Sequence, residues 1–295
     1  MEKILIAGGS GLIGTGLAEH LRSLGHEVWI LTRKNSDPAR FFLNWDPENK
    51  RIDPLAIEKT AVLINLCGAE LAAKRWTKSR IKELYDSRIG TTRFLFESFK
   101  NSPDLKHYVS ASGAVAYGFD DPEKLYSEEA PFGQDMISDI TRKWEQAADL
   151  FQEKCLVSKI RIAVVLSEKG GALVRLADPV KKGYGAVLGS GEQPIPWIAA
   201  NDLFHLFGHV ITHKLEGAYH ASAGNTTNKE LTQLIAKVLK KRLLPAVPGF
   251  VIRLLFGKMS VMLLFGNRVS NVRIRSTGFS FQSEDLNSTI QRIFG

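Results

Sequence analysis

The first residues that could do chemistry are four glycines near the start of the chain. Gly8, Gly9, Gly11 and Gly14 follow an apolar run and precede a helical pattern. Their G-x-x-G-x-x-G spacing lets the backbone turn tightly and approach a pyrophosphate, which the positive end of the following helix attracts. The alternative is a tight turn without a ligand, but strand, loop and helix occur in the order that a dinucleotide site needs. We therefore predict cofactor contacts from Gly8, Ser10, Gly11, Leu12, Ile13 and Gly14.

The residues after the second apolar run indicate which dinucleotide this loop would hold. An NAD site usually has Asp or Glu about 20 residues beyond the loop, where the carboxylate binds the ribose 2′-hydroxyl. Here the sequence is Thr32-Arg33-Lys34, without a carboxylate. The planar guanidinium of Arg33 suits a 2′-phosphate, although a surface basic pair is the alternative reading. We predict NADP(H), with Thr32 and Arg33 at its adenosine end.

These candidates need a parallel sheet to bring them together. Continuous apolar runs at 4–7, 28–31, 61–66, 108–112 and 160–166 alternate with helical patterns at 12–24, 79–99 and 138–153. Strands that are apolar throughout and separated by helices are typical of a parallel sheet covered on both faces. The sequence therefore predicts an α/β fold, a Rossmann-like doubly wound parallel sheet, over residues 1–170.

The second part of the chain, residues 171–295, has a different pattern. Glycine and proline are frequent up to Pro196, and helical patterns return at 202–212, 228–241, 250–256 and 283–294. Asp202 is expected to cap the first of these helices. We predict a smaller C-terminal α/β lobe, interleaved with the first domain rather than tethered to it.

Composition excludes several classes of protein. The 295 residues are 44% hydrophobic and 24% charged, which is ordinary for a globular chain. Only Cys67 and Cys155 are present, so a disulfide scaffold is excluded and a cytoplasmic location is expected. The net charge is +8, but the basic residues are dispersed and no run is longer than Lys240-Lys241-Arg242. We expect no nucleic-acid partner, no membrane partner, and a monomer or homodimer.

Several motifs resemble one family along the whole chain. They include Asn65-Leu66-Cys67-Gly68, Arg75-Trp76, Ser87-Arg88 before Thr91-Thr92, Tyr117-Gly118, Lys143-Trp144-Glu145 and Pro196-Trp197-Ile198. With the glycine loop, these resemble the atypical "epimerase family protein" branch of the extended short-chain dehydrogenases/reductases. The resemblance implies an epimerase-like fold, in which residues 171–295 form the smaller C-terminal α/β substrate lobe. It also implies that Leu66, Cys67, Gly68, Glu83, Arg88 and Val165 lie near the cofactor.

The catalytic pair of that superfamily, Tyr-x-x-x-Lys, is missing. No tyrosine here has a lysine four residues later, and alignment on Glu145 places Ile137 and Thr141 at the two positions. Neither side chain can exchange a proton as the Tyr-Lys pair does. The nearest substitutes are Ser138, Asp139 and Lys143, although Lys143 could be a solvated helix residue. By the same resemblance, Ser112 would hydrogen-bond the reacting carbonyl unless Gly113 occupies that position. Tyr117 would border the substrate, or would be only an aromatic wall.

Two functions follow from these observations. The first is an NADP(H)-binding oxidoreductase or epimerase-like enzyme for a small polar or nucleotide-linked substrate. The second is a non-catalytic NADP(H) sensor or regulator. Retention of Ser112, Tyr117 and Trp197 favours the first, and the absence of the Tyr-Lys pair favours the second.

Overall fold

A computed structural model describes residues 1–119, 121 and 123–295, and its main feature is one large twisted sheet. Across the sheet the strands follow one another in the order β12 (Gly217–Ala221), β8 (Leu156–Ile162), β6 (His107–Gly113), β5 (Thr60–Asn65), β1 (Lys3–Ala7), β2 (Glu27–Thr32), β3 (Phe42–Asp46) and β4 (Arg51–Ile52). All neighbours are parallel except β3 and β4. The predicted doubly wound fold is confirmed, with β3, β4 and β12 as additional strands.

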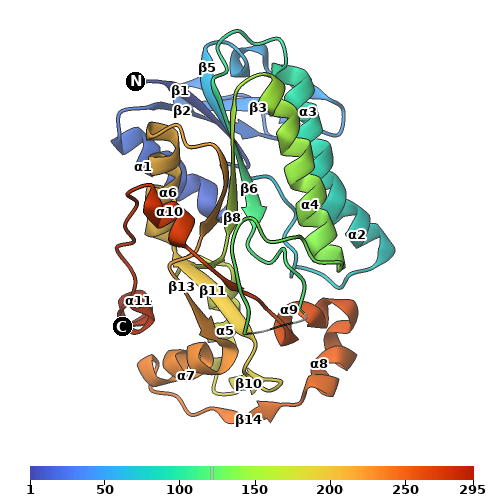
Figure 1. The fold of residues 1–295 in the computed structure, drawn as a ribbon, viewed down its shortest axis with the longest axis vertical. Coiled ribbons are helices and arrows are strands. Elements are labelled where there is room, and N and C mark those ends of the chain that lie inside the picture. The colour runs from blue at the N-terminus through green and yellow to red at the C-terminus, as the bar shows by residue number, and fades with distance from the viewer. Residues whose placement is uncertain (120, 122) are drawn as a thin grey trace.

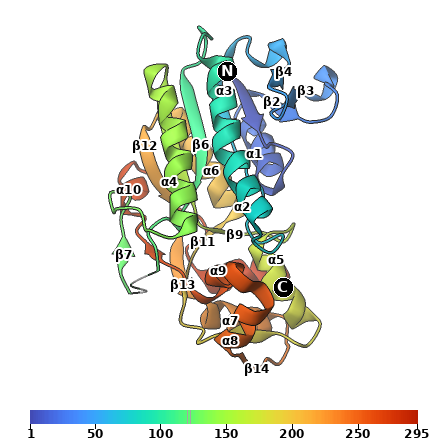
Figure 2. The same cartoon turned by 90° about the vertical axis from the view of Figure 1, so that its right-hand side faces the viewer.

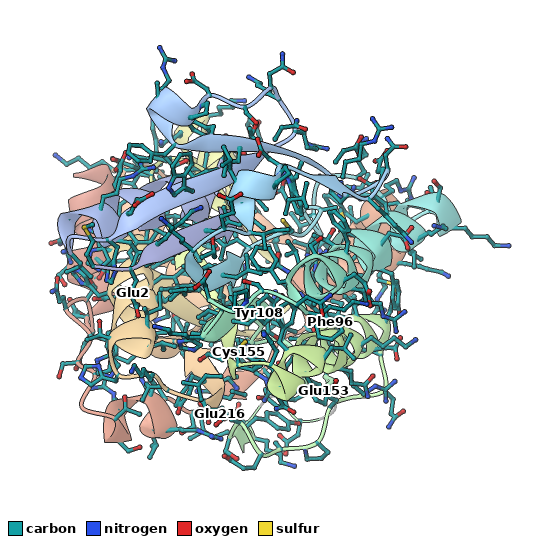
Figure 3. The ribbon with its side chains drawn as sticks, turned by 90° about the horizontal axis from the view of Figure 1, so that it is seen from above. Glu2, Phe96, Tyr108, Glu153, Cys155 and Glu216 are labelled. Atoms are coloured by element: carbon teal, nitrogen blue, oxygen red, sulfur yellow. The ribbon has the colours of Figure 1, made fainter. Side chains whose placement is uncertain are left out.

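Helices cover both faces of this sheet (Figures 1 and 2). One face carries α1 (Leu12–Ser23) and α6 (Ala200–Thr212); the other carries α2 (Lys78–Tyr85), α3 (Thr91–Phe99) and α4 (Met136–Asp149). Figure 3, seen from the end opposite the small lobe, shows Tyr108 and Phe96 beside the helices of the second face. There Tyr108 stacks on Phe151 with ring centroids 3.7 Å apart. Two apolar cores, one on each side of the sheet, explain why its strands are apolar throughout.

The small lobe lies at the carboxyl ends of the large sheet's strands (Figure 1). It contains three short pairings, β13 (Gly224–Thr227) with β11 (Pro194–Ala199) and β9 (Val164–Leu166), β10 (Ala186–Leu188) with β14 (Leu244–Val247), and β7 (Leu125–Tyr126) with β15 (Arg268–Val269). The later helices are α5 (Ala172–Lys181), α7 (Asn228–Val238), α8 (Gly249–Phe256), α9 (Val261–Leu264), α10 (Val272–Ser276) and α11 (Leu286–Phe294). The chain passes between the two parts several times, because α6 and β12 return to the large sheet.

Three local predictions need correction. The run at 160–166 is two strands, since β8 ends at Ile162 and β9 joins the small sheet. The helix at 79–99 is interrupted by a π-helical turn at Asp86–Gly90. Asp202 does not cap α6, because its carboxylate accepts the backbone N–H groups of Gln282 at 2.8 Å and Ser283 at 2.9 Å. It fixes the C-terminal segment instead. No described helix is long and apolar enough to cross a membrane.

Candidate functional site

The glycine loop packs against the segment that follows β5. Gly8 has φ +79°, and a Cβ on it would lie 3.0 Å from the backbone carbon of Leu66. A Cβ on Gly14 would lie 2.4 Å from the Cα of Gly9, so the fold itself requires glycine at 14. Gly11 differs, because a Cβ there would meet only the Gly8 oxygen, at 3.3 Å. The inner glycines are therefore needed for packing, whereas Gly11 faces the open side of the loop.

The start of α1 has its backbone donors free for a ligand. Gly11 is the N-cap residue, and among the described residues no side chain caps the helix and no acidic residue lies in its first turn. Ser10, Gly11 and Leu12 are exposed, and Ile13 is half-buried. The helix dipole and the unpaired N–H groups of this first turn favour an anion at that position.

Arg33 stands at the end of β2, beside the loop. It is exposed, and within the described part of the chain it has no hydrogen bond or ion pair. Thr32 accepts the backbone N–H of Lys34 at 3.2 Å, which forms the turn that carries Arg33. Arg33 is close enough to Cys67 to act on its thiol electrostatically, although burial dominates and raises the pKa of Cys67 to about 12. The ends of β1, β2 and β5 therefore meet as predicted.

The loop after β5 is held by a buried amide. Asn65 accepts the N–H of Cys67 at 3.0 Å and donates to Thr92 and to the hydroxyl of Tyr108, each at 3.0 Å. A Cβ on Gly68 would lie 3.0 Å from the guanidinium carbon of Arg88, so glycine lets the loop approach that side chain closely. The positions of Leu66, Cys67 and Gly68 next to the glycine loop are consistent with a place along a bound cofactor.

The π-helical turn supports this loop from behind. Arg88 is buried there and donates to the carbonyls of Ala69 at 3.1 Å and Leu84 at 3.2 Å. Burial lowers its pKa to about 10. Ser87 Oγ accepts the N–H of Ala69 at 2.9 Å, a contact that sequence reasoning missed. Because Arg88 and Ser87 hold residues 68–69, an irregular turn in mid-helix has a positioning role here.

Two predicted cofactor residues lie apart from the loops just described. Glu83 is largely exposed and pairs with the buried Arg80 at 2.7 Å. Val165 lies in β9, where it pairs with Ile198 of the small sheet. Among the described residues no hydrogen bond or ion pair joins the side chain of either one to the glycine loop, so their proximity to a cofactor stays a prediction.

Ser112 and Tyr117 belong to a buried polar network. Ser112 donates to Glu145 at 2.6 Å, and Arg161 donates to both oxygens of Glu145, at 2.7 and 2.8 Å. Arg161 also donates to the Tyr117 hydroxyl at 2.7 Å, and this hydroxyl contacts His220 Nε2. Burial is the largest influence on both groups: it raises the pKa of Tyr117 and lowers that of His220 to about 4. Both candidate hydroxyls are therefore occupied by protein partners.

Ser138 and Lys143, on α4, are occupied as well. Ser138 donates to Asp135, the N-cap residue of α4, and accepts the N–H of Gly118 at 3.2 Å. Lys143 is half exposed and pairs with Asp139 at 2.8 Å. Burial opposes ionisation of Asp139, but hydrogen bonds from Lys143 and its neighbours outweigh it and hold the Asp139 pKa at about 2. Lys143 thus forms an i,i+4 ion pair within α4, and its ammonium lies over the ring of Tyr85 from α2.

An apolar cluster surrounds the positions where the Tyr-Lys pair would stand. Ile137 is 5% exposed and packs with Trp76 and with Met259 from the small lobe. Thr141 is buried and donates to the carbonyl of Ile137 at 2.9 Å. A Cβ on Gly113 would lie 3.6 Å from Thr141 Oγ1, so Gly113, not Ser112, faces this position. Tyr85 also packs against this cluster, but its hydroxyl donates to Asp139 at 2.6 Å.

Comparison with known proteins agrees with this geometry. The model of the NAD dependent epimerase/dehydratase family matches residues 4–139, and a domain of unknown function, DUF1731, matches 247–293. "Epimerase family protein SDR39U1" of Mus musculus is 31% identical over 99% of both chains. The chain belongs to the epimerase family. A Staphylococcus saprophyticus member, "Epimerase family protein SSP1921", is 32% identical over 99% of both chains.

Solved structures extend the comparison to the fold. The human epimerase family protein SDR39U1, crystallised with NADPH, has a TM-score of 0.90 and 30% identity over 99% of this chain and 98% of that one. A Corynebacterium glutamicum nucleoside-diphosphate sugar epimerase has a TM-score of 0.79 and 25% identity over all of this chain and 58% of that one. This epimerase-family chain therefore retains the family's architecture and brings the glycine loop, Arg33 and residues 66–68 together.

Proposed function

We propose that this protein binds NADP(H) across the carboxyl ends of β1, β2 and β5. The observation that carries the proposal is Arg33, an exposed and unpaired guanidinium at the end of β2, where no carboxylate is available for a ribose 2′-hydroxyl. The glycine loop and the open first turn of α1 suit the pyrophosphate. The NADPH-bound human relative supports the same assignment.

A bound nicotinamide would supply a hydride donor or acceptor, and the chain's own groups would orient it. Residues 66–68, supported by Asn65 and Arg88, would line the cofactor between the glycine loop and the end of β6. The nicotinamide ring would lie toward Gly113 and the small lobe. Because Ser112, Tyr117, Ser138 and Lys143 all have protein partners, the proton that accompanies hydride transfer would come from solvent.

As the reaction class, we propose hydride transfer to or from a small polar or nucleotide-linked substrate held by the small lobe. The second candidate is a non-catalytic NADP(H) sensor, favoured by the occupied hydroxyls and by the apolar cluster at Ile137. Two incubations distinguish these candidates: the NADPH-loaded protein with simple carbonyl compounds, and the NADP⁺-loaded protein with nucleotide sugars. Loss of NADPH absorbance in the first or its gain in the second supports the enzyme, and tight cofactor binding without turnover supports the sensor.

Calorimetric titration of NADPH and NADH tests the cofactor assignment itself. A charge-assisted contact is worth about 1.5–3 kcal/mol, so Arg33→Ala should weaken NADPH binding roughly tenfold or more and leave NADH binding unchanged. Lys34→Ala, the neighbouring exposed cation, is the matched control and should change neither affinity by as much. Equal affinity of the unmodified protein for both cofactors would refute the assignment.

A further inference from the structure

The net positive charge of this protein comes from one segment of the chain. Residues 231–283 contain nine Lys and Arg and no Asp or Glu. The rest of the chain has 30 basic and 31 acidic residues, so it is close to neutral. The sequence contains only short basic runs. The pattern is therefore visible as an absence of acidic residues over 53 positions, and not as a cluster of lysines. Where the cations of such a segment are exposed and unpaired, they favour an anionic partner.

Helix α8, in this segment, is apolar on two opposite faces. Ile252 is 1% exposed and Phe256 packs into the cluster at Ile137, so these residues form the inner face. Phe250 and Leu254 lie one turn apart on the outer face and are 71% and 76% exposed. Leu255 beside them is 59% exposed. A helix that is apolar on its solvent face lacks a partner there.

This outer face forms the far end of the small lobe. Figures 1 and 2 show α8 and β14 together at the end of the molecule opposite the large sheet. Leu244 of β14, 53% exposed, adds a further apolar side chain at this end. The end surface, defined by Leu244, Phe250, Leu254 and Leu255, therefore projects away from the rest of the protein, where an extended partner can reach it.

Unpaired cations accompany the end surface. The exposed basic residues of its elements and their flanks are Lys240, Lys241, Arg242, Arg253 and Lys258. In the described part of the chain none of the five has an ion-pair partner. In contrast, Arg273 and Arg275, later in the same segment, pair with Glu129 at 2.7 Å and Glu284 at 2.9 Å. Lys237 of α7 is likewise exposed and has no ion pair among the described residues, so six of the nine cations of the segment are free.

We propose that the end surface binds a bilayer that carries anionic headgroups. Such a bilayer satisfies both features, because headgroups attract the free cations while Phe250, Leu254 and Leu255 enter the acyl boundary. A second copy would oppose like charges, and a nucleic acid would leave the apolar side chains in water. This peripheral contact needs no membrane-spanning helix, and it differs from the sequence-based expectation of no membrane partner.

Helix α8, which would contact the bilayer, also lies against residues of the candidate site. Arg75, next to Trp76 of the apolar cluster, donates to the carbonyl of Leu254 at 3.3 Å. Met259, just beyond α8, packs against Ile137 in the same cluster. Helix α8 therefore covers the apolar side of the candidate site. In the proposed orientation, that side of the site lies toward the lipid surface.

Co-sedimentation with vesicles tests the proposal on the full chain. We expect binding to an equal mixture of phosphatidylcholine and phosphatidylglycerol, weaker binding at high salt, and little binding to phosphatidylcholine alone. Lys241→Gln with Arg253→Gln should lower the partition coefficient about 25-fold, since each basic residue near the surface contributes about fivefold. Phe250→Gln with Leu254→Gln should lower it at least tenfold. All four side chains are exposed, so the variants should remain folded.

Matched controls are Arg51→Gln and Leu24→Gln, exposed residues of β4 and of the end of α1, which should leave vesicle binding unchanged. Equal losses in the controls, or no binding to anionic vesicles, would overturn the proposal. So would binding of a labelled DNA duplex without vesicle binding, or a dimer that dissociates in the Phe250 and Leu254 variant while vesicles stay unbound. NADPH affinity, measured in parallel, is expected to stay constant, which separates this test from that of the proposed function.

Discussion

The charge pair between Glu145 and Arg161 allows a quantitative test of how the site is held. The side chains are 5% and 4% exposed, and the pair has two N–H···O contacts at 2.7 and 2.8 Å. Glu145→Gln removes the negative charge and leaves the Arg161 guanidinium buried without its counter-ion. Breaking a buried pair by removing one partner costs about 3–5 kcal/mol. For a chain of this size, about 2 °C of melting temperature corresponds to each kcal/mol, so we expect a decrease of about 6–10 °C.

Differential scanning calorimetry of the variant measures this shift directly. The control is Glu97→Gln, which breaks the exposed pair with Lys100 at 2.6 Å and should cost no more than about 1 kcal/mol. Adding Arg161→Gln to Glu145→Gln should recover part of the loss, because the uncompensated charge is then removed. If Glu145→Gln lowers the melting temperature no more than Glu97→Gln does, the reasoning about the buried network is wrong.

The same pair predicts a pH dependence. Burial by itself would raise the pKa of Glu145, but the hydrogen bonds and charge of Arg161, with Ser112, hold it below its usual range. A carboxyl with a depressed folded-state pKa contributes stability that is complete above its unfolded pKa and is lost as the pH falls through the folded value. The stability difference between wild type and Glu145→Gln should therefore be full at pH 7 and shrink below about pH 4.

Three further outcomes are expected. Gly11→Val should abolish NADPH binding in calorimetry, while its circular-dichroism spectrum stays that of a folded protein. Gly14→Ala should also lower the melting temperature, because its Cβ would collide with the loop backbone. Intact NADPH binding in Gly11→Val would contradict our view of the loop. Lys143→Met should leave any turnover within about twofold, since Lys143 pairs with a surface carboxylate, and a loss of tenfold or more would contradict this. Ile137→Tyr with Thr141→Lys should restore no activity and should destabilise the protein by about 1–3 kcal/mol through overpacking, so a gain in NADPH turnover would contradict the apolar cluster.

Much of the large sheet could be predicted, because each of its central strands is apolar on both faces and each helix between them is amphipathic. The edge strands were missed for a physical reason. β3 is covered less completely and β4 is only two residues long, so neither gives a continuous apolar run. β12 lies beyond the glycine-rich region, and its sequence, Gly-Ala-Tyr-His-Ala, does not resemble a buried strand. The buried ring of His220 in this strand is stabilised by contacts with the Tyr117 hydroxyl and the Ser270 carbonyl, both far from it in the sequence.

The candidate site was predictable where backbone geometry sets the residue type. Gly8 and Gly14 are glycines because no side chain fits, and that requirement is visible in the sequence. The partners of Ser112 and Tyr117 were not visible, because they come from other elements of the chain. A serine or lysine has the same letter whether it is free to react or held by a carboxylate, and only the fold distinguishes the two.

The return of residues 217–221 to the large sheet bears on how the protein is made. β8 lies beside β6 on one side, but its other edge is covered by β12, more than 50 residues later in the chain. While a ribosome synthesises the intervening small-lobe segment, the open backbone of β8 can pair with any other extended chain. Nascent chains released before β12 emerges should therefore aggregate, and the protein should depend on chaperones during that interval of its synthesis.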